Sequence, residues 1–251
     1  MHARVIPCLL MRNGGLFKTV RFKNARYIGD PINAVRIFNE KEVDELVVLD
    51  IGSPGGRGVP DFELLADIAS EAFMPFAYGG GITSIEHVKR LYALGVEKVV
   101  LNTSAADKPY LVSEVAALAG SSGVVVSIDV RRNWMGKYSV HVAGGTRDLK
   151  RDPAAYAHEM EQLGAGEILL NSIDRDGTME GYDLELVGKV CKAVSIPVVA
   201  AGGAAGLPHF REAVGAGASG LAAGSMFVFH GKHKAVLITY PEYEELERVF
   251  K

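Results

Sequence analysis

Acidic side chains follow apolar segments of this chain at places where they could transfer protons. Asp129 ends the apolar run 124–128 within VVVSIDVRR, and Asp176 lies a few residues after another such run, within SIDRDGT. A run without polar alternation indicates a strand buried on both faces, as in a parallel sheet. Catalytic groups of α/β enzymes lie just past the carboxyl ends of such strands. Asp129 and Asp176 are therefore candidates for a general acid and base pair.

Each of these carboxylates also has a structural interpretation. Asp129 could cap a turn or bridge a neighbouring charge, because structural ion pairs are common too. Asp174, two residues before Asp176, could close a turn by bonding its own backbone. Asp50 ends a further apolar segment and is another carboxylate at a strand end. We interpret Asp129 and Asp176 as catalytic and leave both interpretations open for Asp174.

Paired glycines occur in each half of the chain, and a small polar residue follows each pair further along. The first set is Gly80, Gly81, Asn102 and Thr103, and the second is Gly202, Gly203, Gly224 and Ser225. Glycine lets backbone N–H groups approach an anion, and the N-terminus of the next helix adds partial positive charge. The glycines could instead serve only tight turns. Because the two sets are equivalent, we predict two phosphate sites on opposite sides of one barrel mouth.

Apolar segments alternate with helical patterns along the whole chain. Each helical pattern carries its own boundary signals, such as Pro31 after Asp30, or Ser84 before a helix that stops at Gly95. This alternation predicts a single (β/α)8 TIM barrel spanning residues 1–251, with a doubly wound open sheet as the rival fold. The eight expected strands are Val5–Leu9, Leu46–Ile51, Pro75–Tyr78, Lys98–Leu101, Val124–Ile128, Ile168–Leu170, Pro197–Ala201 and Gly220–Ala223.

The second half of the chain repeats the first. Segment 78–104, YGGGITSIEHVKRLYALGVEKVVLNTS, matches segment 200–225, AAGGAAGLPHFREAVGAGASGLAAGS, at a step of 122 residues. The same step carries Glu45 and the apolar run after it onto Glu167 and its run. A period of half the chain indicates two fused half-barrels rather than a solenoid. The repeat therefore favours a closed barrel over an open sheet.

Charged residues precede four of the predicted strands, and an insertion follows the fifth. Segment 135–147 alternates in polarity and is predicted to form a small hairpin beside the catalytic face. At the opposite end, the charged residues would ring the barrel bottom, where a stabilising ion network is the default interpretation. These residues are Arg4, Glu45, Lys98 and Glu167.

Composition is that of an ordinary globular protein. The 251 residues carry a net charge of −3 and 48% are hydrophobic, so nothing indicates nucleic-acid binding. No apolar run is long enough to span a membrane, and no signal peptide is evident. Cys8 and Cys191 lack metal-type spacing and are interpreted as reduced, buried thiols. We expect a cytoplasmic protein that does not bind membranes, metals or cofactors.

Five motifs together resemble one family over nearly the whole chain, the cyclase subunit of imidazole glycerol phosphate synthase. They are LVVLDI (46–51), YGGGI (78–82), VVVSIDVRR (124–132), GAGEILLNSIDRDGTMEGYD (164–183) and AAGGA (200–204). The resemblance implies two phosphate sites for a phosphorylated ligand. It also implies a glutaminase subunit docked on the barrel bottom, whose ammonia would travel through the barrel. Arg4, Glu45, Lys98 and Glu167 would form the ammonia gate, and Lys18, Asp50, Asn171 and Asp174 would contact substrate from the loops.

One position departs from the family pattern. The family has a second catalytic aspartate at the end of strand one, in an Ala-Cys-Leu-Asp context, whereas segment 6–10 here reads Ile-Pro-Cys-Leu-Leu. The internal repeat also places Leu10 opposite Asp129, at a step of 119 residues. A leucine can neither transfer protons nor accept hydrogen bonds, so cyclisation should be slowed by about 10²–10⁴.

Segment 4–46 resembles a divergent branch of this family that works in acetamidino modification of bacterial surface sugars. Its Pro-Cys-Leu-Leu and Gly-Asp-Pro-Ile-Asn-Ala-Val runs carry the resemblance. This branch implies a three-part system, in which the barrel conducts ammonia from a glutaminase to a separate sugar amidotransferase. Two alternatives stay open: a true cyclase of histidine biosynthesis, and a non-catalytic scaffold joining two enzymes.

Overall fold

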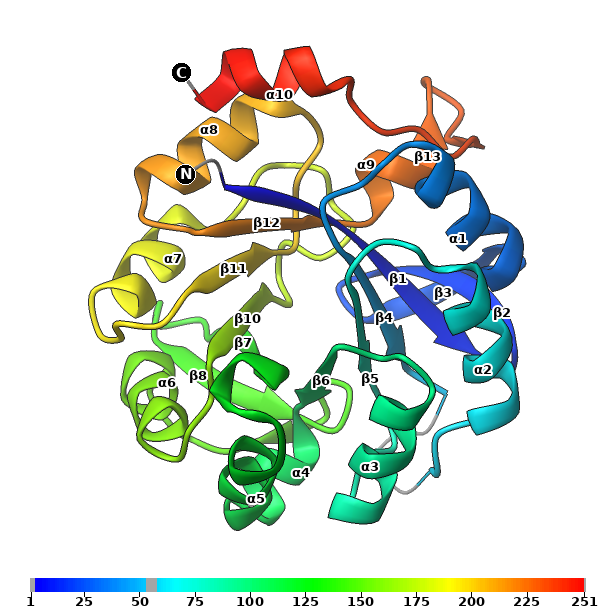
Figure 1. Ribbon diagram of the computed structural model, residues 1–251. Helices are drawn as coiled ribbons and strands as arrows, with labels where there is room; N and C mark the ends of the chain where they lie inside the picture. The colour runs from blue at the N-terminus through cyan, green and yellow to red at the C-terminus, as the bar shows by residue number, and fades with distance from the viewer. Residues whose placement is uncertain (1–2, 53–57, 251) are drawn as a thin grey trace.

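Eight parallel strands form the centre of the molecule, with helices outside them (Figure 1). The computed structural model describes residues 3–52 and 58–250. The barrel strands are β1 (Arg4–Arg12), β4 (Leu46–Asp50), β5 (Phe76–Gly79), β6 (Lys98–Leu101), β7 (Val124–Arg132), β10 (Glu167–Ser172), β11 (Val198–Ala201) and β12 (Gly220–Ala223).

Strand pairing closes these strands into a ring. β1 pairs in parallel with both β12 and β4, and β10 pairs in parallel with both β7 and β11. An open sheet would leave two edge strands, whereas here every barrel strand has two neighbours. The predicted (β/α)8 barrel is therefore confirmed, and the doubly wound alternative is wrong.

Helices follow the barrel strands, and five of those named below begin at a residue whose side chain caps the first turn. Asp30 and Asp152 each accept hydrogen bonds from the first helical turn, and each is followed by a proline at the first helical position. The helices of the described residues are α1 (Pro31–Glu40), α2 (Phe62–Glu71), α3 (Ile85–Ala93), α4 (Thr103–Asp107), α5 (Tyr110–Ala119), α6 (Pro153–Gln162), α7 (Leu184–Cys191), α8 (Leu207–Gly215), α9 (Ser225–Val228) and α10 (Tyr243–Phe250), and a 3₁₀ turn lies at Ser121–Gly123.

Two antiparallel extensions decorate the mouth at equivalent places. The predicted insertion after the fifth strand is present as β8 (Tyr138–Val142) and β9 (Arg147–Asp148), which extend from β7. A second extension follows β1, as β2 (Gly15–Val20) and β3 (Lys23–Gly29), and the sequence prediction missed it. A short pair, β13 (Phe229–His230) with β14 (Ala235–Val236), lies near the C-terminus.

Apolar side chains form two layers of core. The larger layer lies between strands and helices, and within it Phe227 contacts the rings of Phe38, Phe210 and Tyr240 at centroid distances of 5.4–6.5 Å. The smaller layer fills the barrel interior with one apolar residue from each of seven barrel strands and two from β11: Ile6, Val47, Ala77, Val100, Val125, Leu169, Val199, Ala201 and Ala222. The barrel is thus packed along its axis and is not an open pore.

The sequence also predicted reduced, buried cysteines and no segment long enough to span a membrane. Cys8 and Cys191 are both free thiols, and both are half-buried rather than fully buried. Within residues 3–52 and 58–250, no helix has the length and hydropathy needed to cross a membrane.

Phe227 gives the first testable prediction. We expect Phe227→Ala to lower the free energy of unfolding by about 3–5 kcal/mol, because the substitution opens a cavity among three aromatic rings. Phe73 is 81% exposed, so Phe73→Ala should change the free energy of unfolding by less than about 0.5 kcal/mol. Urea denaturation of both variants measures the difference, and equal losses would contradict the assignment of the core.

Candidate functional site at the barrel mouth

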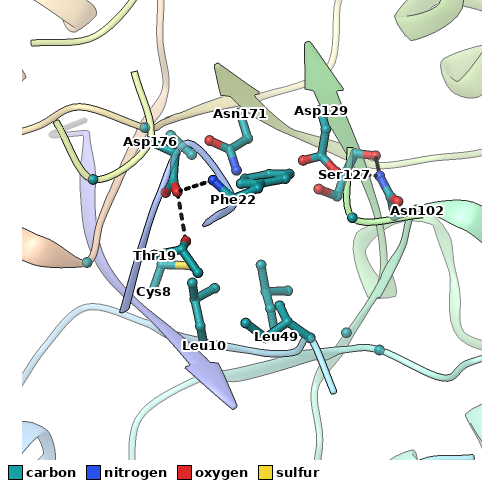
Figure 2. A pocket seen from close by; sticks show the side chains of 18 of the residues that line it. Cys8, Leu10, Thr19, Phe22, Leu49, Asn102, Ser127, Asp129, Asn171 and Asp176 are labelled. Carbon is teal, nitrogen blue, oxygen red and sulfur yellow. Dashed lines mark hydrogen bonds between the residues drawn. The ribbon is translucent and has the colours of Figure 1, made fainter. Parts of the chain in front are cut away.

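A cavity of about 480 Å³ lies at the carboxyl ends of the barrel strands. It brings together side chains that are far apart in the sequence, including Asp129, Asp176 and Lys18. Both predicted glycine sets also line it, as do Asp50 and Asn171. Figure 2 shows that carboxylates and amides gather on one side of this cavity, while Leu10 and Leu49 lie on the other.

Asp129 is buried at the polar side of the cavity. Only 7% of its surface is exposed, and its Oδ2 accepts a hydrogen bond of 3.2 Å from Asn102 Nδ2. Burial raises the pKa of Asp129 to about 7, the charge of Asp176 adds to the rise, and hydrogen bonds from Asn102 and Asn171 oppose it. A carboxyl group with this pKa can give or take a proton near neutral pH.

Asp176 lines the same cavity but also holds the β2–β3 hairpin in place. Its Oδ2 accepts hydrogen bonds from the Thr19 hydroxyl, at 2.8 Å, and from the Phe22 backbone N–H, at 3.2 Å (Figure 2). Gly177 lets the hairpin approach, because a Cβ there would lie 2.1 Å from the Thr19 carbonyl oxygen. The structure therefore gives Asp176 a positioning function beside the predicted catalytic one.

Strand register shows which residues are equivalent in the two halves. In the second half, Asp129 of β7 is paired with Asn171 of β10. In the first half, Leu10 of β1 is paired with Leu49 of β4. Asn171 and Leu49 are 122 residues apart, which is the step of the repeat. The structure therefore confirms that Leu10 occupies the position equivalent to Asp129, and it adds Leu49 as a second apolar replacement.

The mouth is consequently asymmetric. The second half contributes a carboxylate and an amide, and the Oδ1 atom of Asn171 is buried without a hydrogen-bond partner among the described residues. An N–H or O–H donor of a ligand could satisfy it. In the first half the two equivalent positions hold Leu10 and Leu49, although Asp50 and Asn102 of that half also line the cavity. Cys8 lies there too, and burial raises its pKa to about 11. Cys8 therefore stays a neutral thiol near neutral pH and is a poor nucleophile.

The glycine pairs have a packing role that does not depend on a ligand. A Cβ on Gly80 would lie 2.5 Å from the Asp50 carbonyl oxygen, and one on Gly202 would lie 2.7 Å from that of Ser172. Both glycines also have positive φ angles, of 123° and 88°. Tight turns alone are therefore enough to require glycine at these two positions. Phosphate binding by the glycine pairs stays a prediction.

Polar side chains make the two glycine sites different from each other. At the second site Lys18 reaches across from β2, and its Nζ lies within 1.8 Å of where a Cβ on Gly224 would be. This places a cation beside Ser225, whose surface is only 7% exposed. At the first site Thr103 Oγ1 accepts a hydrogen bond of 3.0 Å from Ala143 N. The cationic second site is better suited to a phosphate dianion.

Asp50 and Asp174 make local backbone contacts. Asp50 Oδ1 accepts a hydrogen bond of 2.8 Å from Gly52 N, and burial raises the pKa of Asp50. Asp174 Oδ2 accepts one of 2.8 Å from Arg132 N. Asp174 does not line the main cavity and instead faces a neighbouring pocket. Its predicted contact with a ligand of the main cavity therefore lacks structural support.

The four charged residues at the barrel bottom form a closed ring, as their positions predict. Arg4 bridges Glu45 and Glu167, and Lys98 bridges the same two carboxylates at 2.8 and 3.0 Å. Both glutamates are buried, whereas Arg4 and Lys98 are half-buried. The ring lies directly below the apolar layer that fills the barrel. The structure confirms the ion network, and its function as a gate stays a prediction.

Several residues of the site were missed by the sequence analysis. Thr19 and Phe22 enter it only because the β2–β3 hairpin folds over the mouth. Ser127 lines the cavity two residues before Asp129, and the alternation of side chains along a strand could have identified it. Leu49 could have been found from Asn171 by the same step of 122 residues.

These features define a (β/α)8 barrel made of two equivalent halves, with a mixed polar and apolar pocket at its mouth and an ion ring at its base. A model of the family described as histidine biosynthesis protein matches residues 4–234. The chain belongs to this family, within which it is a barrel of the HisF-like cyclase type of imidazole glycerol phosphate synthase.

Individual relatives agree with this placement. A protein of Pseudomonas aeruginosa, provisionally named imidazole glycerol phosphate synthase subunit hisF2, is 51% identical over 98% of this chain and 99% of its own. A provisionally named HisF subunit of Leptospira interrogans is 46% identical over 100% and 99%. The imidazole glycerol phosphate synthase subunit HisF of Streptomyces coelicolor is 43% identical over 91% of each chain.

The raised pKa of Asp129 predicts a pH-dependent stability difference. Its ordinary value of 3.8 applies to the unfolded chain, so the folded state retains the proton up to about pH 7 and loses stability as the pH rises between these values. Asp129→Asn removes this loss. We expect the variant to gain on the order of 4 kcal/mol relative to the wild type between about pH 4 and pH 8.

Urea denaturation at several pH values measures this difference. The exposed Asp67→Asn substitution is the matched control, because it removes one negative charge outside the cavity. A stability difference between wild type and Asp129→Asn that does not change with pH would contradict the raised pKa.

Proposed function

We propose that this barrel conducts ammonia from a glutaminase subunit, docked at its base, to a separate sugar amidotransferase that receives the ammonia at its mouth. The product would be an acetamidino sugar. In this function the barrel keeps the architecture of a cyclase subunit while cyclisation itself is lost. The protein would work in the cytoplasm, where its partners and phosphorylated ligands occur.

The position of Leu10 carries this proposal. Strand register places it opposite Asp129, where a second carboxylate would complete the acid and base pair. Its strand neighbour Leu49 is apolar too, and the next carboxylate on that wall, Asp50, accepts a hydrogen bond from Gly52 N. Losing one of two proton-transfer groups costs about 10²–10⁴ in rate. The rest of the barrel is kept, which fits a function other than proton transfer.

The barrel axis supports ammonia transport. A ligand moving upward from the base meets the ion ring, then the apolar layer, then the polar side of the mouth. Neutral ammonia can cross an apolar layer, whereas ammonium would lose its hydration without a partner there. The four ion pairs close the ring. Ammonia can therefore pass through the ring only when at least one of these pairs opens. Arg4 and Lys98 are the more exposed members and therefore the ones that can move.

The predicted phosphate sites fit a phosphorylated small molecule at the mouth. Lys18 beside Gly224 supplies a cation, and Thr103 and Ser225 supply hydroxyl groups. The residues Asn102, Asn171 and Asp129 then face the remainder of the ligand. Such a ligand could be bound without being cyclised.

A true cyclase of histidine biosynthesis is the second candidate function. Asp129, Asp176 and Lys18 favour it, because all three line the cavity between the two predicted phosphate sites. The pKa of about 7 also suits Asp129 to proton transfer. The names of relatives at 40–43% identity describe subunits of that synthase. Leu10 and Leu49 remain the observations against it.

Isotope labelling tests transport directly. The barrel is combined with its cognate glutaminase and sugar amidotransferase, ¹⁵N-amide glutamine and an excess of unlabelled ammonium. We expect the amidino nitrogen of the product to come from glutamine in the wild-type complex. In Lys98→Met the ring keeps both carboxylates but only one cation, so the label should be replaced by unlabelled nitrogen while total product from ammonium is retained.

Lys192→Met is the matched control, because Lys192 lies at the end of α7 and makes no ion pair among the described residues. It should keep the wild-type labelling. Dilution of the label in the wild-type complex to the level of free ammonium would contradict transport through the barrel. Thermal unfolding of each variant separates loss of the gate from loss of the fold.

A further inference from the structure

A second pocket, of about 600 Å³, opens beside the mouth on the outer side of the β2–β3 hairpin. We call it the lateral pocket. Its wall comes from the hairpin tip, from β7, from the loop after β10 and from the segment between β13 and β14. The charged residues in this wall are Arg21, Lys23, Arg131, Asp174, Glu180 and Lys234.

Positive charge predominates in the lateral pocket, and its two carboxylates offset only part of it. Within the part of the chain that the structure describes, Arg21, Lys23, Arg131 and Lys234 form no salt bridge. Of the two acidic residues, Glu180 lies 3.9 Å from Arg175, whereas Asp174 accepts a hydrogen bond from Arg132 N and keeps its negative charge in the wall. Four positive and two negative side chains give the wall a net charge of +2. The unpaired cations repel one another, and a bound anion would relieve this repulsion.

Backbone contacts hold the two arginine-bearing segments in place. Arg21 has a φ angle of 53°, its N–H donates to the Asp176 carbonyl oxygen at 2.9 Å, and its Nε donates to the Asp174 carbonyl oxygen at 3.1 Å. Arg131 lies on β7, where its register partner is Ser139 of β8. The hairpin and the barrel wall therefore present one guanidinium each to the same pocket.

We propose that the lateral pocket is a third anion site, which binds the diphosphate group of a small-molecule ligand. Guanidinium groups donate paired hydrogen bonds that match phosphate oxygens, and the two lysines add charge without fixed geometry. A diphosphate carries enough negative charge to balance the net charge of +2 in this wall. A single carboxylate would leave half of this net charge unmatched.

The lateral pocket adjoins the main cavity. Lys23, Asn24 and Gly177 line both. One elongated ligand can therefore place its reacting end near Asp129 and its diphosphate in the lateral pocket. The inference does not depend on whether the barrel conducts ammonia or cyclises a ribonucleotide, because it concerns anion binding alone.

Calorimetric titration of the purified chain with inorganic pyrophosphate tests this site. We expect Arg21→Gln combined with Arg131→Gln to weaken the lateral site at least about tenfold, because both guanidinium contacts are lost. Arg21→Lys combined with Arg131→Lys keeps the charge and should recover part of the affinity. Arg211→Gln, which removes an exposed cation on α8, is the matched control and should bind as the wild type does.

Pyrophosphate could also bind at the predicted sites in the main cavity, and Lys18→Met distinguishes the two locations. The proposal expects Lys18→Met to leave lateral binding intact. It is overturned if Lys18→Met removes all binding while the double glutamine variant binds as the wild type does. It is also overturned if the double glutamine variant and Arg211→Gln bind equally, provided thermal unfolding shows each variant to be folded.

Discussion

The parallel hydrogen-bonding register of the barrel determines which side chains face each other across its mouth. Each strand is paired on both sides, so shifting one residue would turn every inward side chain of that strand toward the helices. The register therefore places Asp129 and Asn171 in one half, and Leu10 and Leu49 in the other, at equivalent positions. A local shift of β1 or β4 therefore cannot place a carboxylate at the positions of Leu10 and Leu49. The apolar wall of the first half is a fixed property of the fold, and the proposed loss of cyclisation follows from it.

Along the axis, the same packing separates three environments with different chemistry. The ion ring at the base is stabilised by four pairs between two buried glutamates and two cations. Above it, small and branched apolar residues exclude charge. The mouth then offers amides, carboxylates and the cation of Lys18 to a ligand. A neutral nitrogen compound entering from below and an anion binding from above would meet at Asp129. The lateral pocket extends the anion-binding side of this arrangement.

Much of this structure could be predicted from the sequence, because local patterns encode it. Apolar runs predicted the barrel strands, and the step between the halves identified Leu10. The β2–β3 hairpin was missed, since it is fixed by Asp176, whose carboxylate is more than 150 residues away from Thr19 and Phe22. The lateral pocket was missed for the same reason, because separate segments assemble it. The glycine pairs line the mouth, but tight packing explains them without a ligand, so phosphate binding by them stays a prediction.

The most direct test of the central claim is a cyclase assay on the purified wild-type chain with an ammonium salt and the ribonucleotide of the histidine pathway. Leu10 stands in place of the second carboxylate. We therefore expect imidazole glycerol phosphate to form about 10²–10⁴-fold more slowly than it would with an intact acid and base pair. Leu10→Asp, assayed alongside, should recover part of this rate. Robust production of imidazole glycerol phosphate by the wild-type chain would contradict the account.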